Sequence, residues 1–417
     1  MIQREAYMDR IRPFIDKDLV KVFTGIRRSG KSTLLKLVQQ ELIAAGVLEN
    51  QICTINFESL AYANRDMLSI YQELKRFSES QDKKSYVFLD EIQELTGWEK
   101  MVNSLRVDLN CDLYITGSNS KLLSGELATY LAGRYIEISV YPFSFKEMMK
   151  MKKEKQSALS PEEEFQIFLR FGGMPFIYEN DLDQTAALHY LRDIFNSILL
   201  KDIIARHSIR DIELFERVIS YLLANVANSF SGANVMKYLK NEKRPLSLET
   251  LYNYISHARE ACLLHLVPRK DVQGKKLLKF QEKIFLADPG IREAVYGNNQ
   301  RDINQILENI VFLELRRRGY DVHIGKSNGR EIDFIAERTS QKIYIQVAYL
   351  ITDPAVAERE FSALAGIQDN YPKMVLSLDK FDFSREGIIH RNLIEFLMEQ
   401  ESGAANESLS LASARKS

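Results

Sequence analysis

The sequence GIRRSGKS occupies residues 25–32 and fits the pattern G-x-x-x-x-G-K-[ST]. An apolar segment at 19–24 precedes it, and residues 32–45 carry apolar side chains at helical spacing. Glycines allow a tight turn in which backbone N–H groups surround phosphate oxygens, and the following helix points its positive end at the same anion. The pattern and its strand–turn–helix context therefore predict a loop that binds the phosphates of a nucleotide.

The residues of this loop have distinct expected roles in binding ATP and Mg²⁺. Lys31 is placed to reach the β- and γ-phosphates, where it also assists catalysis, and Ser32 is placed to ligate Mg²⁺. Arg27 and Arg28 occupy variable positions of the pattern, so the individual role of each stays open. The alternative is a glycine turn that happens to contain a lysine. The residues expected to contact the nucleotide are Gly25, Arg28, Ser29, Gly30, Lys31, Ser32 and Thr33.

A second half of the site follows the short apolar segment at 86–89, which ends in Asp90 and Glu91. An acid at the end of such a strand lies beside the Mg²⁺ that Ser32 ligates, so Asp90 is the expected metal ligand. Glu91 is the expected general base, which orients and deprotonates the attacking water and contributes about 10²–10⁴ in rate. The alternative is an acidic surface turn, because Glu94 lies nearby.

Further candidates lie at the ends of other apolar segments. Ser118 and Asn119 follow the segment at 113–116, and either could sense the γ-phosphate unless they form only a turn. Arg134 is the candidate γ-phosphate arginine, acting in cis or across a subunit contact in a homo-oligomer; the alternative is a solvated arginine. Glu58 is a weaker candidate.

Apolar segments alternate with helical patterns throughout the first third of the chain. Strands are expected at 19–24, 51–57, 86–89, 113–116 and 135–140. The fully apolar segment at 86–89 is typical of a strand covered on both faces. The predicted fold is therefore α/β, with the doubly wound parallel sheet of a P-loop NTPase.

The composition is that of an ordinary globular protein. Of 417 residues, 45% are hydrophobic and 27% charged, and the net charge of -1 favours neither nucleic acid nor an acidic membrane as partner. Three separated cysteines and the lack of an 18-residue apolar run favour a cytoplasmic protein without a membrane segment. The six histidines show no metal-ligand spacing, so we expect no zinc or catalytic role for them.

Several longer motifs together resemble one family of bacterial and archaeal AAA-type ATPases. These are GIRRSGKSTLL, FLDEIQE, TGSNSKLLSGELATYLAGRY, VYPFSFKEM and FGGMP. The resemblance implies an ATPase core of the ASCE class, in which a glutamate follows the Mg²⁺-binding aspartate. It also implies a winged-helix segment and a C-terminal domain similar to PD-(D/E)XK restriction endonucleases.

The expected domains follow from these patterns. They are an ATPase domain at 1–149, a helical connector at 150–225, a winged helix at 226–297, a nuclease-like α/β domain at 298–400 and a disordered tail at 401–417. The charged residues 150–164 are expected to form a linker or an exposed loop.

The expected winged helix offers a candidate contact with DNA. A helix at 247–262 precedes two apolar, basic strands, at 264–267 and 276–280, that read as a hairpin wing. Residues 236–283 contain 11 Lys or Arg and 5 Asp or Glu, and such an excess can track phosphates. The exposed face of the helix carries Glu249 and Glu260 as well, so packing beside the ATPase core is the alternative.

The nuclease-like segment lacks part of the chemistry that its scaffold would need. Glu308, Asp333 and the segment at 343–348 occur in the expected order, but Gln346 and Ala348 stand where a metal-binding acid and a lysine are required. Lys326 could supply an amine from another direction. We therefore expect a scaffold without standard cleavage activity that binds nucleic acid or a protein partner.

These observations favour an ATP-hydrolysing molecular switch that moves its C-terminal domains against a protein partner or DNA. A second hypothesis is a DNA-cleaving effector in which ATP licenses the nuclease-like domain. A third is a non-hydrolysing adaptor that binds ATP only to order its fold, against which the placement of Glu91 argues.

Overall fold

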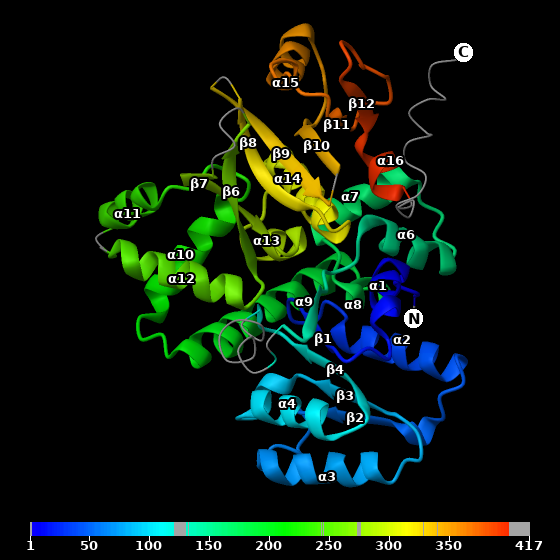
Figure 1. Ribbon diagram of the computed structural model, residues 1–417. Helices are drawn as coiled ribbons and strands as arrows, with labels where there is room; N and C mark the ends of the chain where they lie inside the picture. The colour runs from blue at the N-terminus through cyan, green and yellow to red at the C-terminus, as the bar shows by residue number, and fades with distance from the viewer. Residues whose placement is uncertain are drawn as a thin grey trace.

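The computed structural model describes residues 2–120, 131, 133–242, 244, 246–272, 277–327, 329–339 and 341–399 (Figure 1). The tail expected at 401–417 lies outside this range. The first part of the chain forms a five-stranded parallel sheet in the order β2-β3-β4-β1-β5. Its strands are β1 (Val20–Thr24), β2 (Ile52–Asn56), β3 (Ser85–Asp90), β4 (Cys111–Gly117) and β5 (Tyr135–Ser139).

Helices cover both faces of this sheet, which is the doubly wound arrangement expected from the sequence (Figure 1). Helices α1 (Glu5–Ile11) and α2 (Lys31–Ala44) pack on one face, and α3 (Met67–Glu79) and α4 (Trp98–Asp108) pack on the other. Strand residues alternate between the two cores, since Val22 joins one and Phe23 the other. The predicted P-loop NTPase fold is therefore confirmed for this part of the chain.

A helical connector follows, and it begins earlier than the charge pattern indicated. The expected loop at 150–164 is mostly helical, because α6 continues to Glu154 and α7 begins at Pro161. Capping boxes at Ser144 and Ser160 start these two helices, whose charged residues lie mainly on exposed faces. The helices are α6 (Phe145–Glu154), α7 (Pro161–Phe171), α8 (Pro175–Glu179), α9 (Gln184–Ser197), the π-helix η5 (Ile198–Ala205) and α10 (Ile212–Ala224).

The last part of the chain forms a seven-stranded sheet in the order β12-β11-β10-β9-β8-β6-β7. Its strands are β6 (Leu264–Asp271), β7 (Leu277–Leu286), β8 (Asp321–Ser327), β9 (Arg330–Arg338), β10 (Gln341–Val347), β11 (Lys373–Ser377) and β12 (Ile389–Asn392). Its helices are α11 (Gly232–Asn241), α12 (Leu248–Glu260), α13 (Pro289–Val295), α14 (Ile303–Arg317), α15 (Pro354–Ala365) and α16 (Leu393–Met398).

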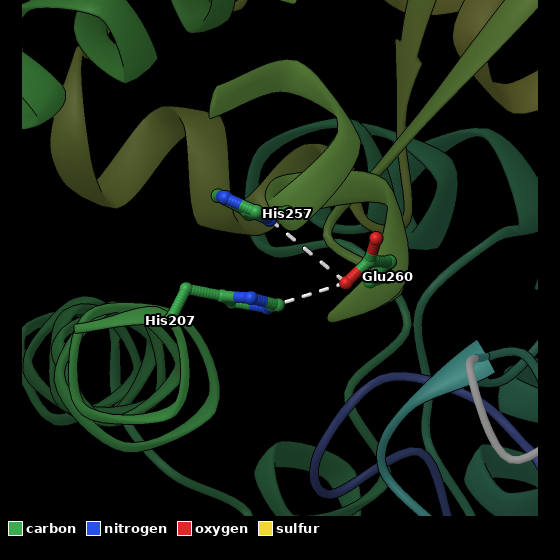
Figure 2. A group of neighbouring side chains, drawn as sticks. All are labelled: His207, His257 and Glu260. Atoms are coloured by element: carbon green, nitrogen blue, oxygen red, sulfur yellow. Dashed lines mark ion pairs between the residues drawn. The ribbon is translucent and has the colours of Figure 1, made fainter. Parts of the chain in front are cut away.

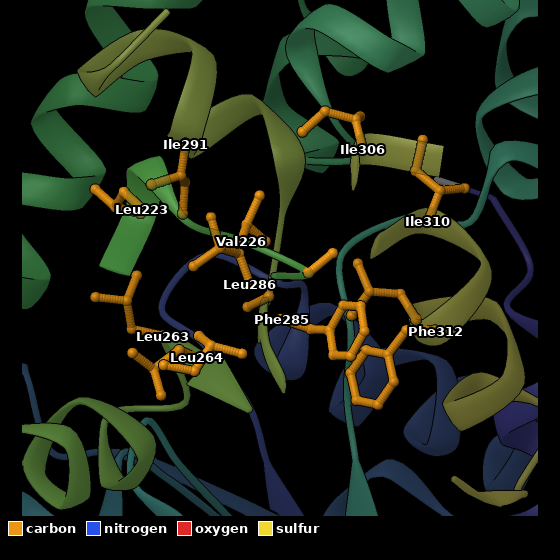
Figure 3. Close-up of a cluster of buried hydrophobic side chains, with 14 of the residues drawn as sticks. Leu223, Val226, Leu263, Leu264, Phe285, Leu286, Ile291, Ile306, Ile310 and Phe312 are labelled. Atoms are coloured by element: carbon orange, nitrogen blue, oxygen red, sulfur yellow. The ribbon is translucent and has the colours of Figure 1, made fainter. Parts of the chain in front are cut away.

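The domain boundary expected after residue 297 does not interrupt this sheet. The β6–β7 hairpin, expected as a wing, joins the C-terminal strands because β6 pairs in parallel with β8. Figure 3 shows the core that results, in which side chains of α10, β6, β7, α13 and α14 meet. The rings of Phe285 on β7 and Phe312 on α14 stack with their centroids 4.5 Å apart. The expected winged-helix and nuclease-like domains thus share one core.

Among the described residues, we find no helix that combines the length and the apolar character needed to cross a bilayer.

Candidate nucleotide site

The loop at 25–32, expected to bind phosphate, lies between β1 and α2, at the edge where all five parallel strands end. Gly25 has a φ of 151°, and a Cβ there would lie 2.1 Å from the carbonyl oxygen of Val140. Gly30, the N-cap of α2, has a φ of 98° in the left-handed region. Both glycines are therefore required by the backbone, and the turn that they permit is the one that the motif predicts.

Lys31 is the first residue of α2 and is only 4% exposed. Its Nζ donates to the carbonyl oxygens of Gly25 at 3.0 Å and Ile26 at 3.3 Å, so the ammonium lies within the turn of the loop. The next residue, Ser32, is exposed, whereas the Ser29 side chain is fully buried. In the described part of the chain the Ser29 hydroxyl has no hydrogen-bond partner. A loop with a cation and an unsatisfied hydroxyl fits a phosphate group.

Asp90 and Glu91 follow β3 at the same edge. Asp90 accepts hydrogen bonds from Thr116 at 2.5 Å and from the amide of Asn56 at 3.1 Å. The backbone N–H of Glu91 donates to the hydroxyl of Thr116 at 2.9 Å, which fixes the turn between the two acids. Glu91 lies 3.5 Å from Lys31 Nζ. The loop cation and both carboxylates thus converge, as the two motifs together predict.

Glu91 has a φ of 52°, in the left-handed region that non-glycine residues rarely adopt. Its side chain accepts a hydrogen bond from Gln93 at 2.6 Å. Such backbone conformations persist where the surrounding structure holds them, and they concentrate at functional sites. Here the hydrogen bond to Thr116 and the contact with Lys31 hold the residue, so its carboxylate is directed into the site.

The two carboxyl groups differ in their electrostatic environment. Burial raises the pKa of Asp90 by more than the hydrogen bonds from Thr116 and Ser32 lower it. Burial also acts to raise the pKa of Glu91, but the nearby Lys31 charge and the Gln93 hydrogen bond outweigh it, so that this pKa is lowered. Glu91 is therefore ionised at neutral pH, the state required to accept a proton.

The remaining candidates near the loop lie where their motifs predict, with one exception. Ser118 and Asn119 follow β4 and are buried at the same edge of the sheet, and the Ser118 hydroxyl is 3.5 Å from Gln93 Nε2. Arg28 is exposed with a φ of 67°, and Thr33 is half-buried at the start of α2. These positions agree with contact to a nucleotide, which stays a prediction for each residue.

Arg134 is the exception, and its expected cis role needs correction. It precedes β5, whose first residue, Tyr135, pairs with Val20 at the start of β1. At about 3.3 Å per strand residue, a distance on the order of 15 Å separates it from the phosphate-binding edge. Its side chain is 57% exposed and lies 3.7 Å from Asp18. Arg134 therefore cannot reach the γ-phosphate bound by its own chain, and only the trans role stays a prediction.

The structure assigns Arg27 a partner that the sequence did not reveal. Its guanidinium contacts both carboxylate oxygens of Asp202, at 2.8 and 2.9 Å, and also Glu58 at 3.0 Å. Asp202 is 1% exposed and lies in the π-helix η5 of the connector, 175 residues away in sequence. π-Helices occur frequently at functional sites. No local pattern links two residues so far apart, which is why sequence reasoning missed this contact.

Arg4 supports the loop from behind. Its guanidinium is 1% exposed, donates to the carbonyl oxygen of Ser29 at 3.0 Å and forms an ion pair with Glu147 at 2.8 Å. It also lies over the ring of Tyr7, 4.4 Å from the centroid. The N-terminal segment thus holds the outer side of the loop in place, a role that a single arginine in the sequence does not signal.

His207, which follows η5, meets His257 and Glu260 of α12 (Figure 2). His207 Nε2 and His257 Nδ1 lie 3.2 and 3.9 Å from Glu260 Oε2. The two rings stack with centroids 3.7 Å apart and planes 16° apart. The nitrogen lone pairs of near-parallel rings cannot converge on one metal ion, although the residue types suit zinc. The cluster therefore acts as a contact between the connector and α12, which sequence spacing did not show.

Two parts of the chain match the models of protein families. The model of a family described as an AAA domain matches residues 17–149, which span the five-stranded sheet. The model of a domain of unknown function, DUF8612, matches residues 162–302. Together with the loop and the acids of β3, the first match defines the N-terminal part as an AAA-type P-loop domain.

The whole chain also has close relatives. An uncharacterised protein of Haemophilus influenzae is 38% identical over 378 residues, which cover 90% of this chain and 93% of the relative. An uncharacterised protein of Methanocaldococcus jannaschii is 31% identical, with 82% of this chain and 77% of the relative covered. The chain therefore belongs to the family that these bacterial and archaeal proteins represent.

Solved structures resemble the chain only distantly. The Orc1 protein of Aeropyrum pernix, determined in complex with DNA, is 12% identical with a TM-score of 0.34 and covers 70% of this chain and 92% of its own. DnaA of Aquifex aeolicus, bound to AMPPCP, is 15% identical with a TM-score of 0.33 and covers 62% and 89%.

Proposed function

We propose that this protein binds ATP with Mg²⁺, hydrolyses it, and uses the change of nucleotide to shift its C-terminal part. The observation that carries this proposal is the convergence of Lys31 with Glu91, 3.5 Å apart, beside Asp90. A protein that only binds ATP has no need of a placed, ionised carboxylate next to the lysine that contacts the phosphates.

The residues fit the two groups that the reaction requires. The hydroxyl of Ser32 and the carboxylate of Asp90 are oxygen ligands of the kind that Mg²⁺ prefers. When bound, the ion neutralises charge on the β- and γ-phosphate oxygens. The backbone N–H groups of the loop and Lys31 orient the phosphates in the same place, and Ser118 or Asn119 contacts the γ-phosphate.

Glu91 then acts as the base in hydrolysis. Its carboxylate takes a proton from a water molecule while the water oxygen forms a bond to the γ-phosphorus. The bond between that phosphorus and the bridging oxygen breaks, and ADP leaves with the electron pair. Lys31 stabilises the negative charge that develops on the phosphate oxygens. Because Glu91 is held by Thr116 and Gln93, little reorganisation is needed as the proton moves.

The connector transmits the change of nucleotide to the C-terminal part of the chain. Arg27 joins the loop to Asp202 of η5, and His207 joins the end of that segment to Glu260 of α12. Ser120, directly after the candidate sensors, donates to the carbonyl oxygen of Glu260 at 3.3 Å. Contacts from both sides of the site therefore meet on α12, so a movement of either is transmitted to the C-terminal sheet.

We further infer which folds the C-terminal part contains. Helices α11 and α12 with the β6–β7 hairpin have the element order of a winged helix. Helix α14, strands β8, β9 and β10, helix α15 and strand β11 have the order expected of the restriction-endonuclease-like domain. Their shared sheet favours a single moving body, so that the unit of motion is 226–399 rather than either expected domain alone.

DNA is a candidate partner through α12, whose exposed face carries Tyr252, Asn253 and Arg259. The charge argument for it is weaker than the sequence indicated. Lys270 of the hairpin forms an ion pair with Glu337 at 2.7 Å, and Lys283 forms one with Glu308 at 2.8 Å. Lys283 is buried and Lys270 is half-buried, and each is paired with a carboxylate, so neither adds a free charge to a basic surface. A protein partner is the alternative.

Phosphate release from ATP tests the proposed activity. We expect turnover by the wild-type protein with Mg²⁺ and a loss of about 10²–10⁴ in Glu91→Gln, which removes the base but keeps the side-chain shape. Glu94→Gln is the matched control, because Glu94 is an exposed acid three residues further on. Equal turnover in all three proteins would refute the assigned base. Adding DNA to the wild type tests the partner, since a rise in turnover supports DNA.

A further inference from the structure

Lys283 lies in the interior of the C-terminal part, surrounded by carboxylates. Its side chain is only 4% exposed, and Nζ lies 2.8 Å from Glu308 Oε2, 2.7 Å from Glu331 Oε1 and 3.7 Å from Asp333 Oδ1. Burying an ammonium costs several kcal/mol unless opposite charges and hydrogen bonds compensate. Three acids do so here, and together with Lys283 they form a largely buried charge cluster away from the candidate nucleotide site.

The four side chains come from three elements. Glu331 and Asp333 are two residues apart on β9 and therefore lie on the same face of the sheet, while Glu308 lies on α14, which packs across that face. Lys283 is delivered by β7, the last strand of the sheet, and pairs with Val267 of β6. The lysine thus reaches the acids only because the hairpin is part of the seven-stranded sheet.

Asp333 is fixed on its other side as well. Its Oδ2 accepts a hydrogen bond from the backbone N–H of Val347 at 2.8 Å, and its own N–H donates to Gln346 Oε1 at 3.3 Å. Gln346, where the sequence lacks the expected acid, therefore contributes a neutral amide to the edge of the cluster. Ala348 is buried and contributes no amine. Lys326, the alternative source of an amine, has no ion pair with these acids in the described structure.

We propose that the ammonium of Lys283 occupies the position that a divalent cation would take among Glu308, Glu331 and Asp333, so that this protein carries an internal cation in place of a metal. A Mg²⁺ or Mn²⁺ ion would lie about 2.0–2.2 Å from the same oxygens that Lys283 contacts, and the two cations cannot share them. The C-terminal part therefore does not perform metal-dependent cleavage of a phosphodiester. The ion pairs of Lys283 also hold the β6–β7 hairpin against α14 and β9.

The ionisation of the cluster agrees with this assignment. Burial lowers the pKa of Lys283, but the charges of Glu308, Asp333 and Glu331 outweigh it and raise the pKa, so the lysine stays protonated. Burial followed by repulsion from Asp333 raises the pKa of Glu308. Arg269 provides a second cation through its ion pair with Glu331. Two cations of the chain thus face the three acids, and the raised pKa of Glu308 reduces the negative charge that is left.

Manganese binding to the full chain tests the proposal, with Asp90→Asn in every protein to remove the metal ligand of the nucleotide site. Without nucleotide, we expect no Mn²⁺ site in the protein that retains Lys283. We expect Lys283→Met to gain a Mn²⁺ site, because three acids are left without their cation. Its affinity for Mn²⁺ should exceed that of the protein that retains Lys283 by at least about tenfold. Adding Glu308→Gln to Lys283→Met should remove the gained site and serves as the control for specificity.

The opposite results are equally clear. A Mn²⁺ site in the protein that retains Lys283, lost in Glu308→Gln, would overturn the proposal, as would a folded Lys283→Met protein that gains no site. If Lys283→Met does not fold, as judged by circular dichroism, the protein that retains Lys283 decides the question alone. Nicking of supercoiled DNA with Mn²⁺ that Lys283→Met abolishes would instead show that the lysine activates water in a metal-dependent nuclease.

Discussion

Arg27 connects the phosphate-binding loop to the connector through one buried carboxylate. Asp202 is 2% exposed at its side chain, whereas Arg27 is 15% exposed and also contacts Glu58, which is 50% exposed. Two hydrogen bonds in parallel make this pair specific for arginine. The arginine therefore forms a direct contact between the loop at 25–32 and η5.

Removing Arg27 should lower stability more than removing Asp202. Arg27→Ala leaves Asp202 buried without its counter-charge, so we expect the free energy of unfolding to fall by about 3–5 kcal/mol. Asp202→Ala should cost less, because Arg27 keeps Glu58 as a partner. Chemical denaturation measures both, with Glu58→Ala as a control that should cost at most about 1 kcal/mol. A loss in Arg27→Ala no larger than that in Glu58→Ala would contradict the assigned role.

For individual site residues, the sequence predicted the positions of those that belong to a local sequence motif. The loop, Asp90 and Glu91 lie where spacing and the preceding apolar strands place them. Arg134 was misplaced because a γ-phosphate arginine has no spacing rule, and which end of β5 it occupies depends on the register with β1. Asp202 was missed because its contact with Arg27 depends on the fold of the connector.

Among the elements, the start of α13 shows how the connector and the C-terminal part are joined. Asp288, the N-cap of α13, is buried and accepts hydrogen bonds from the backbone N–H of Gly290 at 2.8 Å and of Gly173 at 2.7 Å. A Cβ on Gly172 would lie 1.9 Å from this carboxylate, and a Cβ on Gly173 would meet the backbone of Phe143. The FGGMP motif, which contains both glycines, is thus the contact surface for a cap far along the chain.

The buried Asp288 should make stability depend on pH in a known direction. Burial raises its pKa to about 6 despite the backbone hydrogen bonds. The folded state therefore binds a proton more tightly than the unfolded state, and the stabilisation is lost as pH rises from 4 through 6. At about 1.4 kcal/mol per unit of pKa difference, and because the unfolded carboxyl is already partly ionised at pH 4, we expect wild type to lose about 2 kcal/mol between pH 4 and 7 relative to Asp288→Asn. Urea unfolding at both pH values tests this, and a constant difference would show that Asp288 is not buried as a titrating group.

Helices were more predictable than their connections. Capping serines and apolar periodicity indicated α12, which runs Leu248–Glu260 against an expected 247–262. The charged stretch at 150–164 was predicted to be a linker or an exposed loop because of its charged residues. The apolar residues on the opposite, buried face of the helices were not taken into account. The π-helix η5 continues α9 without a break. Nothing in the apolar sequence of η5 distinguishes it from an α-helix.

For the whole molecule, the seven-stranded sheet determines what can move. Strand β6 pairs with β8, more than fifty residues further along the chain, and Lys283 binds acids on α14 and β9. No local pattern predicts such a pairing, so the sequence placed a domain boundary at 297/298 where the structure has a continuous core. The two segments expected to form a winged helix and a nuclease-like domain should therefore behave as one unit.

A chain that ends at residue 297 should not fold like the full protein. It would retain the hairpin but expose the edge of β6 and leave Lys283 without its acids, and unpaired edges promote aggregation. We expect such a chain to be largely insoluble, or to lose secondary structure beyond that of the missing residues by circular dichroism. A soluble, monomeric chain with the full helix content of residues 1–297 would show that the expected boundary is real.

In the proposed mechanism, the bound nucleotide changes the connector and α12. Hydrogen–deuterium exchange tests it in Glu91→Gln, which is expected to hold ATP without hydrolysing it. With ATP instead of ADP, amide exchange in Ile198–Ala205 and Leu248–Glu260 should change by about fivefold or more, which corresponds to a coupling of about 1 kcal/mol. Unchanged exchange in both segments, while the loop at 25–32 is protected by each nucleotide, would contradict the account.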